Sequence, residues 1–145
     1  MRDLKRSENN RLVLTDGVTG EKIVVFYSTP LASQIKAYRQ ASIKRKGDRM
    51  VMNTFDPALK YGLEILTGFE EGAFGFDGKP ISCDPESPNY REDWKVLLAE
   101  TAADIVTIVA AVAFDGVKVE KADSGIEFEG EEAQDILPLE KNSTA

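Results

Sequence analysis

Two carboxylates, Glu100 and Asp104, lie four residues apart in the most apolar stretch of the chain, residues 94–114. On a single helix this spacing places both side chains on one face, one turn apart. Such a pair can ligate Mg²⁺ or take part in general acid–base catalysis. The sequence shows no ligand on a second element that would complete a metal site. We therefore interpret the pair as the solvated edge of a helix and assign no metal ligand.

Nucleophilic and cofactor chemistry have little support in the sequence. The chain has one cysteine, Cys83, in a polar loop, and no histidine. Ser-His-Asp and Cys-His catalysis need a histidine base, and zinc sites are built mainly from histidine and cysteine. Residues 72–82 fail the P-loop pattern, because Ala73 stands at the first glycine position and Pro80 follows the lysine. We predict no catalytic residue, no cofactor and a non-enzymatic protein.

A cluster of basic side chains is the strongest charged feature. Its members are Lys36, Arg39, Lys44, Arg45, Lys46 and Arg49. Such clusters can bind phosphate groups. Asp48 interrupts the cluster, and the whole chain carries a net charge of −7, so an acidic protein surface is at least as suitable a partner as nucleic acid. The alternative function is a nucleic-acid-associated regulator that uses the basic end of a helix over residues 30–46.

The element that must position the carboxylates is residues 94–114, where apolar residues recur at the i, i+3, i+4 spacing of a helix. Alanines form a second face beside the larger apolar side chains. A helix that is apolar over most of its circumference is buried on most sides, either inside its own domain or partly against a partner. The candidate partner-binding residues are Tyr90, Trp94, Ala102, Val106, Val109 and Ala113. Aromatic residues such as the first two can also pin a loop to the core.

The same stretch is too short to cross a membrane. Its longest charge-free run, residues 105–114, has about half of the roughly 20 residues that a span requires. Glu100 and Asp104 would also lie within the hydrocarbon. We expect no membrane association.

The first half of the chain contains signals for three other elements. Alternating residues 11–16 and the β-branched, aromatic residues 22–27 predict a β-hairpin, with Leu12 and Leu14 on one side. Ser28-Thr29-Pro30 predicts a helix that runs to about Lys46, and Asp56-Pro57 predicts a second helix that ends at Gly68. The leucines at 59, 63 and 66 of the second helix are expected to face inward. Residues 49–55 are interpreted as a link that could be extended through Val51.

The second half of the chain is richer in turns. Residues 72–82 predict a short strand or hairpin around Asp77-Gly78, and residues 83–93 predict a surface loop. After the long helix, residues 117–120 and 125–129 alternate and could pair as a hairpin. Residues 115–145 hold nine acidic and three basic side chains, so most of the negative charge belongs to this end.

Together these patterns predict an α+β fold with an N-terminal β-hairpin, about three helices of which the last is long, central and apolar, and an acidic C-terminal extension. We expect a flexible arm over residues 1–10, a single domain over residues 11–116, and a partly disordered extension over residues 117–145. The charged N-terminus lacks the apolar region of a secretory signal, so we expect a cytoplasmic location.

Three segments resemble small proteins encoded in the tail-morphogenesis regions of bacteriophages and prophages. They are TPLASQIKAYRQ (29–40), KYGLEILTGFEEGAFGFDGKPIS (60–82) and YREDWKVLLAETAADIV (90–106). The resemblance, which covers residues 11–114, is to tail assembly chaperones and related tail components. It implies a homo-oligomeric protein in the host cell cytoplasm that binds an aggregation-prone protein, such as a tail tube or tape-measure protein. It transfers no catalytic residue.

Overall fold

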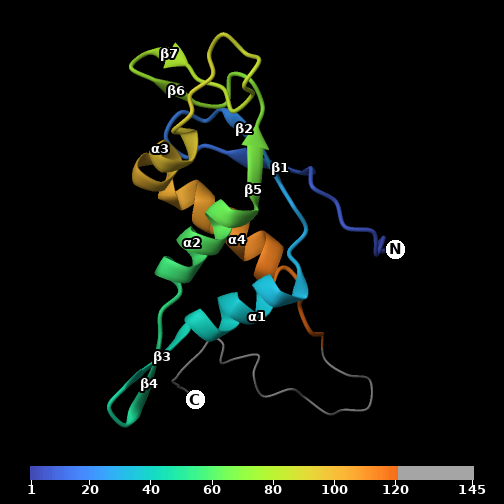
Figure 1. Cartoon of the computed structure of the whole chain (residues 1–145), viewed down its shortest axis with the longest axis vertical. Helices are drawn as coiled ribbons and strands as arrows, with labels where there is room; N and C mark the ends of the chain where they lie inside the picture. Colours follow the sequence, from blue (N-terminus) through green and yellow to red (C-terminus); the bar gives the residue numbers. More distant parts are fainter. Residues whose placement is uncertain (121–145) are drawn as a thin grey trace.

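The computed structural model describes residues 1–120, and the expected disorder of the later extension lies outside this part. Its first sheet begins with the predicted hairpin of β1 (Asn10–Thr15) and β2 (Lys22–Tyr27), shown in Figure 1. The two strands are antiparallel, with Leu12 opposite Val25. Leu12 and Leu14 are half-buried, whereas Val13 between them is 43% exposed. The predicted alternation is confirmed.

A third strand, β5 (Leu66–Phe69), completes this sheet in the order β1-β2-β5. The sequence prediction placed Leu66 and Thr67 in the last turn of a helix that ends at Gly68, which is wrong. The helix α2 (Phe55–Ile65) ends one residue before the strand, and Leu66 is directly opposite Tyr27 of β2. Backbone pairing with a distant strand outweighs the local helical pattern, because it satisfies the backbone polar groups of a buried segment.

The inward face of α2 agrees with the prediction only in part: Leu59 and Leu63 pack against the core, and Leu66 is buried in β5. Leu59 and Leu63 are only half-buried, while Ala58, Gly62 and Ile65 are buried. Gly62 allows a close approach to the next helix, since a Cβ at this position would lie 2.6 Å from the Val106 carbonyl oxygen. The small residues therefore define the contact face.

The long apolar stretch forms two helices and not one. α3 (Trp94–Thr101) and α4 (Ala103–Asp115) meet at Ala102, and their axes differ by 97°. Ala102 has φ −136° and ψ 39°, outside the helical region. The described chain therefore has four helices, and the expectation of one long central helix is wrong.

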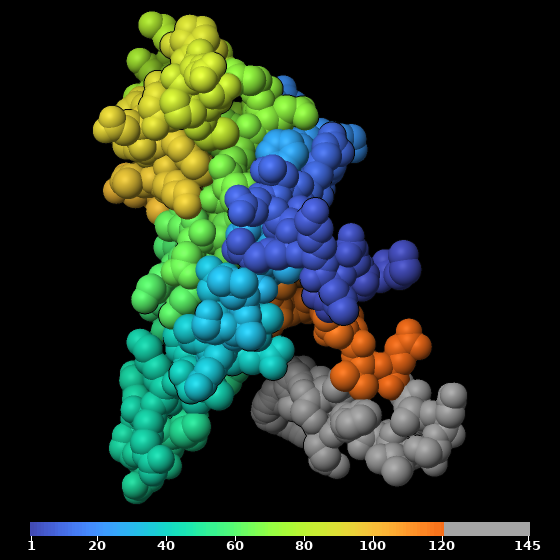
Figure 2. All heavy atoms as spheres, turned by 45° about the vertical axis from the view of Figure 1, so that its right-hand side comes forward, coloured from blue at the N-terminus to red at the C-terminus, as the bar shows by residue number. Residues whose placement is uncertain are grey.

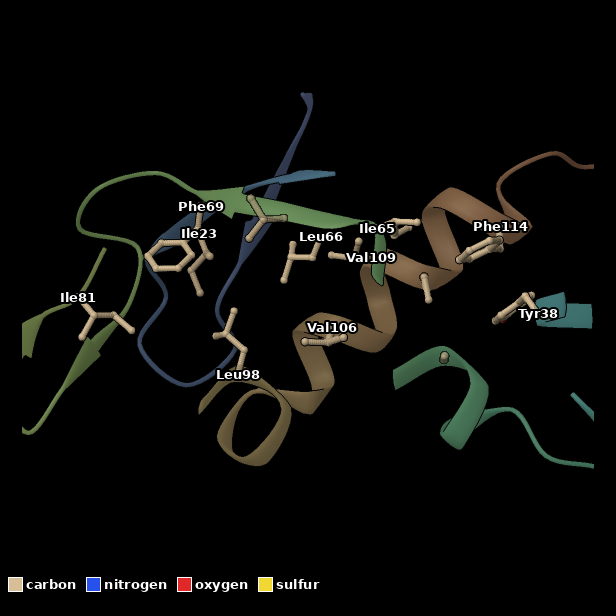
Figure 3. Close-up of a cluster of buried hydrophobic side chains, with 13 residues drawn as sticks. Ile23, Tyr38, Ile65, Leu66, Phe69, Ile81, Leu98, Val106, Val109 and Phe114 are labelled. Carbon is tan, nitrogen blue, oxygen red and sulfur yellow. The ribbon is translucent and has the colours of Figure 1, made fainter. Parts of the chain in front are cut away.

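α4 is the centre of the structure and packs mainly on α2. Figure 3 shows its buried side chains meeting those of β2, β5 and α3. The buried apolar cluster consists of Ile23, Val25, Tyr38, Ala58, Ile65, Leu66, Phe69, Ile81, Leu98, Val106, Val109, Ala110 and Phe114. Close packing of these side chains makes the folded part of the chain rigid.

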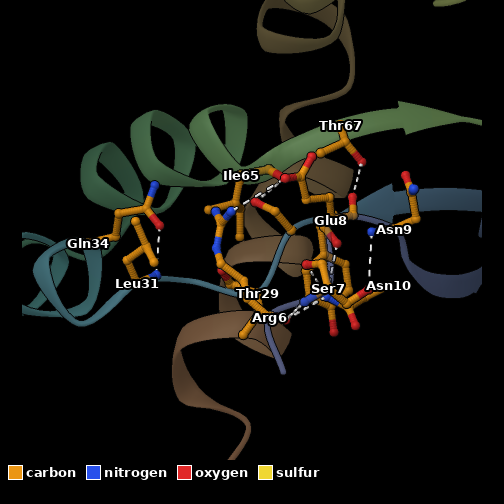
Figure 4. Close-up of polar contacts among 12 residues, drawn as sticks. Arg6, Ser7, Glu8, Asn9, Asn10, Thr29, Leu31, Gln34, Ile65 and Thr67 are labelled. Atoms are coloured by element: carbon orange, nitrogen blue, oxygen red, sulfur yellow. Dashed lines mark hydrogen bonds and ion pairs between the residues drawn. The ribbon is translucent and has the colours of Figure 1, made fainter. Parts of the chain in front are cut away.

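The N-terminal residues are fastened to the sheet over part of their length. The Asn10 side-chain amide donates a hydrogen bond to the Tyr27 carbonyl oxygen at 3.0 Å, and the Thr29 backbone N–H donates one to the Ser7 carbonyl oxygen at 2.7 Å. Arg6 donates from its guanidinium to the Thr29 carbonyl oxygen at 3.0 Å (Figure 4). The second half of the arm predicted over residues 1–10 is therefore held in place by hydrogen bonds.

The other two hairpins lie at opposite ends of the molecule in Figure 1. β6 (Gly75–Phe76) and β7 (Lys79–Pro80) pair around Asp77 and Gly78, which both have positive φ, and this confirms the predicted turn. β3 (Ile43–Lys46) and β4 (Arg49–Met52) form the third hairpin, directly after α1 (Ala32–Ala41).

Candidate protein-binding surface

The β3–β4 hairpin, called the ribbon below, is exposed along almost its whole length. It projects from the body below α1 (Figures 1 and 2). Every residue from Ile43 to Met50 is exposed, and only Val51 of its strands is half-buried. The predicted helix to Lys46 is wrong here, since Ile43–Lys46 is a strand, whereas the link that could be extended through Val51 forms the strand β4.

The register of the ribbon gives it two different faces. Ile43 is opposite Met52 and Arg45 is opposite Met50, while Lys44 is opposite Val51. Lys46 is opposite Arg49. Directly opposite residues share a face, and successive residues alternate between faces. One face therefore carries Ile43, Arg45, Met50 and Met52, and the other carries Lys44, Lys46, Arg49 and Val51.

The first of these faces carries three apolar side chains beside Arg45 and is open to solvent. Met50 and Met52 are 65% and 67% exposed, and Ile43 is 44% exposed. Phe55, which begins α2 just after the ribbon, is 54% exposed. Several large apolar side chains gathered on one element are a common feature of interaction sites, whereas single exposed ones are ordinary.

The second face is basic. Lys44, Lys46 and Arg49 share it, and with Arg45 and Asp48 the ribbon carries a net charge of +3 in a chain of net charge −7. Lys36 and Arg39, the other two members of the predicted basic cluster, lie on α1 and are exposed. The cluster therefore divides between a helix and a ribbon and does not form the end of one helix.

The ribbon has unpaired outer edges within residues 1–120, because β3 and β4 pair only with each other. An unpaired edge presents free backbone N–H and C=O groups to another strand. The chain reverses at Gly47, whose φ of 61° suits glycine. An isolated two-stranded ribbon is marginal in water, so its base must be held by the body of the domain.

The base of the ribbon is held through α1. The Ser42 hydroxyl donates to the Tyr38 carbonyl oxygen at 2.9 Å, and the Asn53 backbone N–H donates to the Ser42 carbonyl oxygen at 2.8 Å. Tyr38 in turn stacks on Phe114 of α4 and donates from its hydroxyl to Asp115. Burial raises the pKa of the Tyr38 hydroxyl well above its usual value. The hydrogen bond to Asp115 and the negative charge of that carboxylate raise it further.

The predicted partner-binding residues of the apolar stretch do not form one surface. Val106 and Val109 are 0% exposed and belong to the core, so they meet no partner while the domain is folded. Trp94 is half-buried with its ring centroid 5.6 Å from that of Phe69. Ala102 lies at the helix break and Ala113 is half-buried, whereas Tyr90 is 37% exposed.

The apolar side chains that α3 and α4 do expose were not among the predicted binding residues. Val96 is 56% exposed, Ile108 45% and Val112 39%. On a helical wheel of residues 94–114, Ile108 and Val112 fall on the same side as the buried Val109. The break at Ala102 changes which side of α4 meets the core, and a continuous helical wheel cannot show this.

Glu100 and Asp104 lie on different helices, on either side of the break, and both are exposed. Among residues 1–120, no group of three or more Cys, Asp or Glu side chains is placed to hold a metal ion. Cys83 is half-buried, and its sulfur accepts a hydrogen bond from the Phe69 backbone N–H at 3.4 Å. This hydrogen bond attaches the loop that contains Cys83 to the last residue of β5.

No single helix in the described part of the chain has the length and hydropathy of a membrane span. α3 and α4 reach that length and composition only as a pair, and the pair is bent by 97°.

Comparison of the chain with known protein families, with curated proteins and with solved structures found no match.

Proposed function

We propose that the protein is a non-enzymatic assembly factor that binds another protein through the β3–β4 ribbon. The observation that carries this proposal is the projecting ribbon itself, with Met50 and Met52 about two-thirds exposed on one face and basic residues on the other. Extended partners add to open strand edges through backbone hydrogen bonds, and side-chain pockets on the two faces give selectivity. Methionine suits such a surface because its unbranched chain adapts to irregular partners.

The resemblance to tail-morphogenesis proteins supports a partner of the tail tube or tape-measure class, bound in the host cell cytoplasm. The charge on the ribbon favours a partner segment that combines apolar and acidic residues. A homo-oligomer is part of the same proposal. Val96, Ile108 and Val112 supply an apolar area on α3 and α4 that a second subunit could cover.

The test pairs the full chain with the tail tube or tape-measure protein encoded in the same genome. The variant Met50→Ser/Met52→Ser should weaken the measured binding by at least tenfold, because burial of each methionine contributes about 1.5–3 kcal/mol. The matched control Val13→Ser/Val18→Ser removes exposed apolar side chains from β1 and the following turn. It should bind as the unchanged protein does.

Light scattering over a concentration series tests the oligomer independently of any partner. We expect a multimer whose mass falls when Ile108 and Val112 are both changed to Ser. A chain that stays monomeric at every concentration and binds neither tail protein contradicts the proposal.

The basic face of the ribbon supports a second candidate function, binding of nucleic acid. Two-stranded ribbons can enter a DNA groove, and Lys44, Lys46 and Arg49 lie together on one face. Fluorescence anisotropy with a short labelled duplex at 50 mM salt measures this directly. Binding that disappears in Lys44→Ala/Lys46→Ala/Arg49→Ala, and falls steeply with salt, would favour this function. Absence of binding at low salt removes it.

A further inference from the structure

We infer that the ribbon of one molecule docks on the opposite end of a second copy of the same chain. The receiving surface is residues 70–93, called the acidic end below, which contain β6 and β7. The contact itself is argued from the charges and exposed side chains of the described residues. Its effect on partner binding rests on the proposed function, because the ribbon is the surface proposed above to bind a tail protein.

Charge is separated along the described chain. The acidic end contains seven acidic and two basic side chains, a net charge of −5, whereas the ribbon carries a net charge of +3. All seven carboxylates are exposed, and so are the four cationic side chains of the ribbon. The other described residues carry ten acidic and ten basic side chains and are neutral as a set. The excess charge of the described chain therefore lies on two surfaces of opposite sign.

These two surfaces lie at opposite ends of the molecule. Figure 1 shows the ribbon at the bottom and β6 and β7 at the top, with α1, α2 and α4 between them. Figure 2, turned by 45°, again shows the atoms of the acidic end at the top and those of the ribbon at the bottom. The two surfaces of one folded chain therefore cannot meet, and the ribbon can reach only the acidic end of another copy.

The acidic end also exposes aromatic side chains. Phe76 of β6 is 49% exposed and Tyr90 is 37% exposed. The guanidinium carbon of Arg91 lies 4.5 Å from the centre of the Phe76 ring. Aromatic residues, methionine and arginine are enriched in protein interfaces, and methionine sulfur packs favourably against aromatic rings. Met50 and Met52 of the ribbon therefore meet suitable side chains on the same surface whose carboxylates suit the ribbon's cations.

Contacts between two identical surfaces are less suitable, because they bring like charges together. Ribbon against ribbon opposes two surfaces of charge +3, and acidic end against acidic end opposes two of charge −5. Like charges across an interface reduce affinity. The contact between unlike ends leaves a free ribbon on one molecule and a free acidic end on the other. Because these surfaces lie at opposite ends of the molecule, further copies add in an open chain.

The open chain regulates access to the ribbon. Every ribbon in it except the one at its end is covered by the next copy. A partner that binds the ribbon must displace this copy, so its apparent affinity falls with the fraction of ribbons that are covered. The partner in turn should shorten the chains, because coupling between two binding events is reciprocal.

Sedimentation velocity on the full chain tests the contact without any partner. Every sample carries Ile108→Ser/Val112→Ser, so that the apolar area on α3 and α4 does not contribute to self-association. We expect the mean mass to grow with concentration from about 1 to about 200 μM in 0.1 M salt, as mass action requires. In 1 M salt the association should weaken at least tenfold, because the screening length falls from about 10 Å to about 3 Å.

Two variants that each reverse charge at one end identify the surfaces. Lys44→Glu/Lys46→Glu acts on the ribbon, and Glu86→Lys/Glu92→Lys acts on the acidic end. Within residues 1–120 none of these four side chains makes a hydrogen bond or ion pair, so the fold should be kept. Each variant alone should stay monomeric. An equal mixture should form a dimer that does not grow, because each pair has one intact ribbon and one intact acidic end.

The matched controls make the same changes in net charge away from both ends. They are Lys5→Glu/Lys118→Glu and Glu8→Lys/Glu120→Lys, at exposed positions near the two ends of the described chain. Both should associate as their parent does. Controls that lose association equally would show an effect of net charge and overturn the inference.

Three further outcomes overturn the inference. The first is a parent that stays monomeric at every concentration in 0.1 M salt, a result that depends on neither charge-reversal variant. The second is a mixture that stays monomeric although both variants melt as the parent does. The third is an acidic-end variant that still dimerises alone, which would assign the contact to two ribbons. No tail protein is present in these experiments, so binding of such a partner to the ribbon is judged separately.

Discussion

The ring of Tyr38 lies stacked on the ring of Phe114, with centroids 4.5 Å apart and planes inclined by 10°. This contact joins the end of α1 to the end of α4, which are far apart in the sequence. Tyr61 of α2 meets both rings edge-on, at 6.2 and 6.4 Å. The three rings fix the base of the ribbon to the core and set where the chain leaves the domain.

Removing the Tyr38 hydroxyl changes the alkaline stability of the protein. Because the folded-state pKa of Tyr38 is raised above its ordinary value of 10.0, its contribution is complete below pH 10 and is lost as the pH rises above it. Tyr38→Phe should therefore show a shallower fall in the free energy of unfolding above pH 10. At pH 7 the lost hydrogen bond should cost about 1 kcal/mol. Urea unfolding at pH 7, 10 and 11 measures both effects, and an unchanged alkaline slope contradicts this account.

Gly62→Ala should destabilise the protein although alanine favours helices. The new Cβ would lie 2.6 Å from the Val106 carbonyl oxygen and 3.0 Å from Val106 Cγ1, so α2 and α4 must separate. Overpacking of this kind costs about 1–3 kcal/mol. Gly17→Ala is the control, because nothing lies within 4 Å of a Cβ there. Thermal unfolding should show a lower Tm for the first variant only.

Two valines three residues apart on α4 should respond very differently to truncation. Val109 is fully buried, so Val109→Ala should cost about 2 kcal/mol from lost burial and the cavity left behind. Val112 is 39% exposed, and Val112→Ala should change the free energy of unfolding by less than about 0.5 kcal/mol. Chemical denaturation of both variants tests the assignment of the core face. Equal losses at the two positions would mean that the helix is rotated from its described orientation.

The exposed face of the ribbon should contribute to binding and little to folding. Met50→Ser/Met52→Ser replaces two largely exposed side chains, so the free energy of unfolding should stay within about 0.5 kcal/mol of the original. The same variant should lose partner binding, as proposed above. A loss of several kcal/mol would instead show that this face is covered in the free protein.

Several elements could be predicted from the sequence because their signals are local. The alternation of Leu12, Val13 and Leu14 and the β-branched run of β2 specify a hairpin with one buried side. Asp77-Gly78 specifies a turn through residues that tolerate positive φ. The starts of α1 and α2 are found to within two residues, since proline and small polar residues favour the first turn.

The candidate site could not be predicted in this way. The basic residues of the ribbon were recognised, but as a helix end, because Ile43–Lys46 follows α1 with only Ser42 between them. Met50 and Met52 were not singled out, since only strand register shows that they share a face with Ile43. The alternation from Arg49 to Met52 and the glycine at the turn were the available signals.

The sequence by itself determined the fold class, the first hairpin, the turn residues and the acidic end of the chain, because each depends on residues close together. Only the tertiary structure decided that the apolar stretch breaks at Ala102, that Leu66–Phe69 pairs with β2, and which valines of α4 are buried. Periodicity is the same for a straight and a broken helix. Contacts between distant segments determine where the helix bends and which of its faces meets the core.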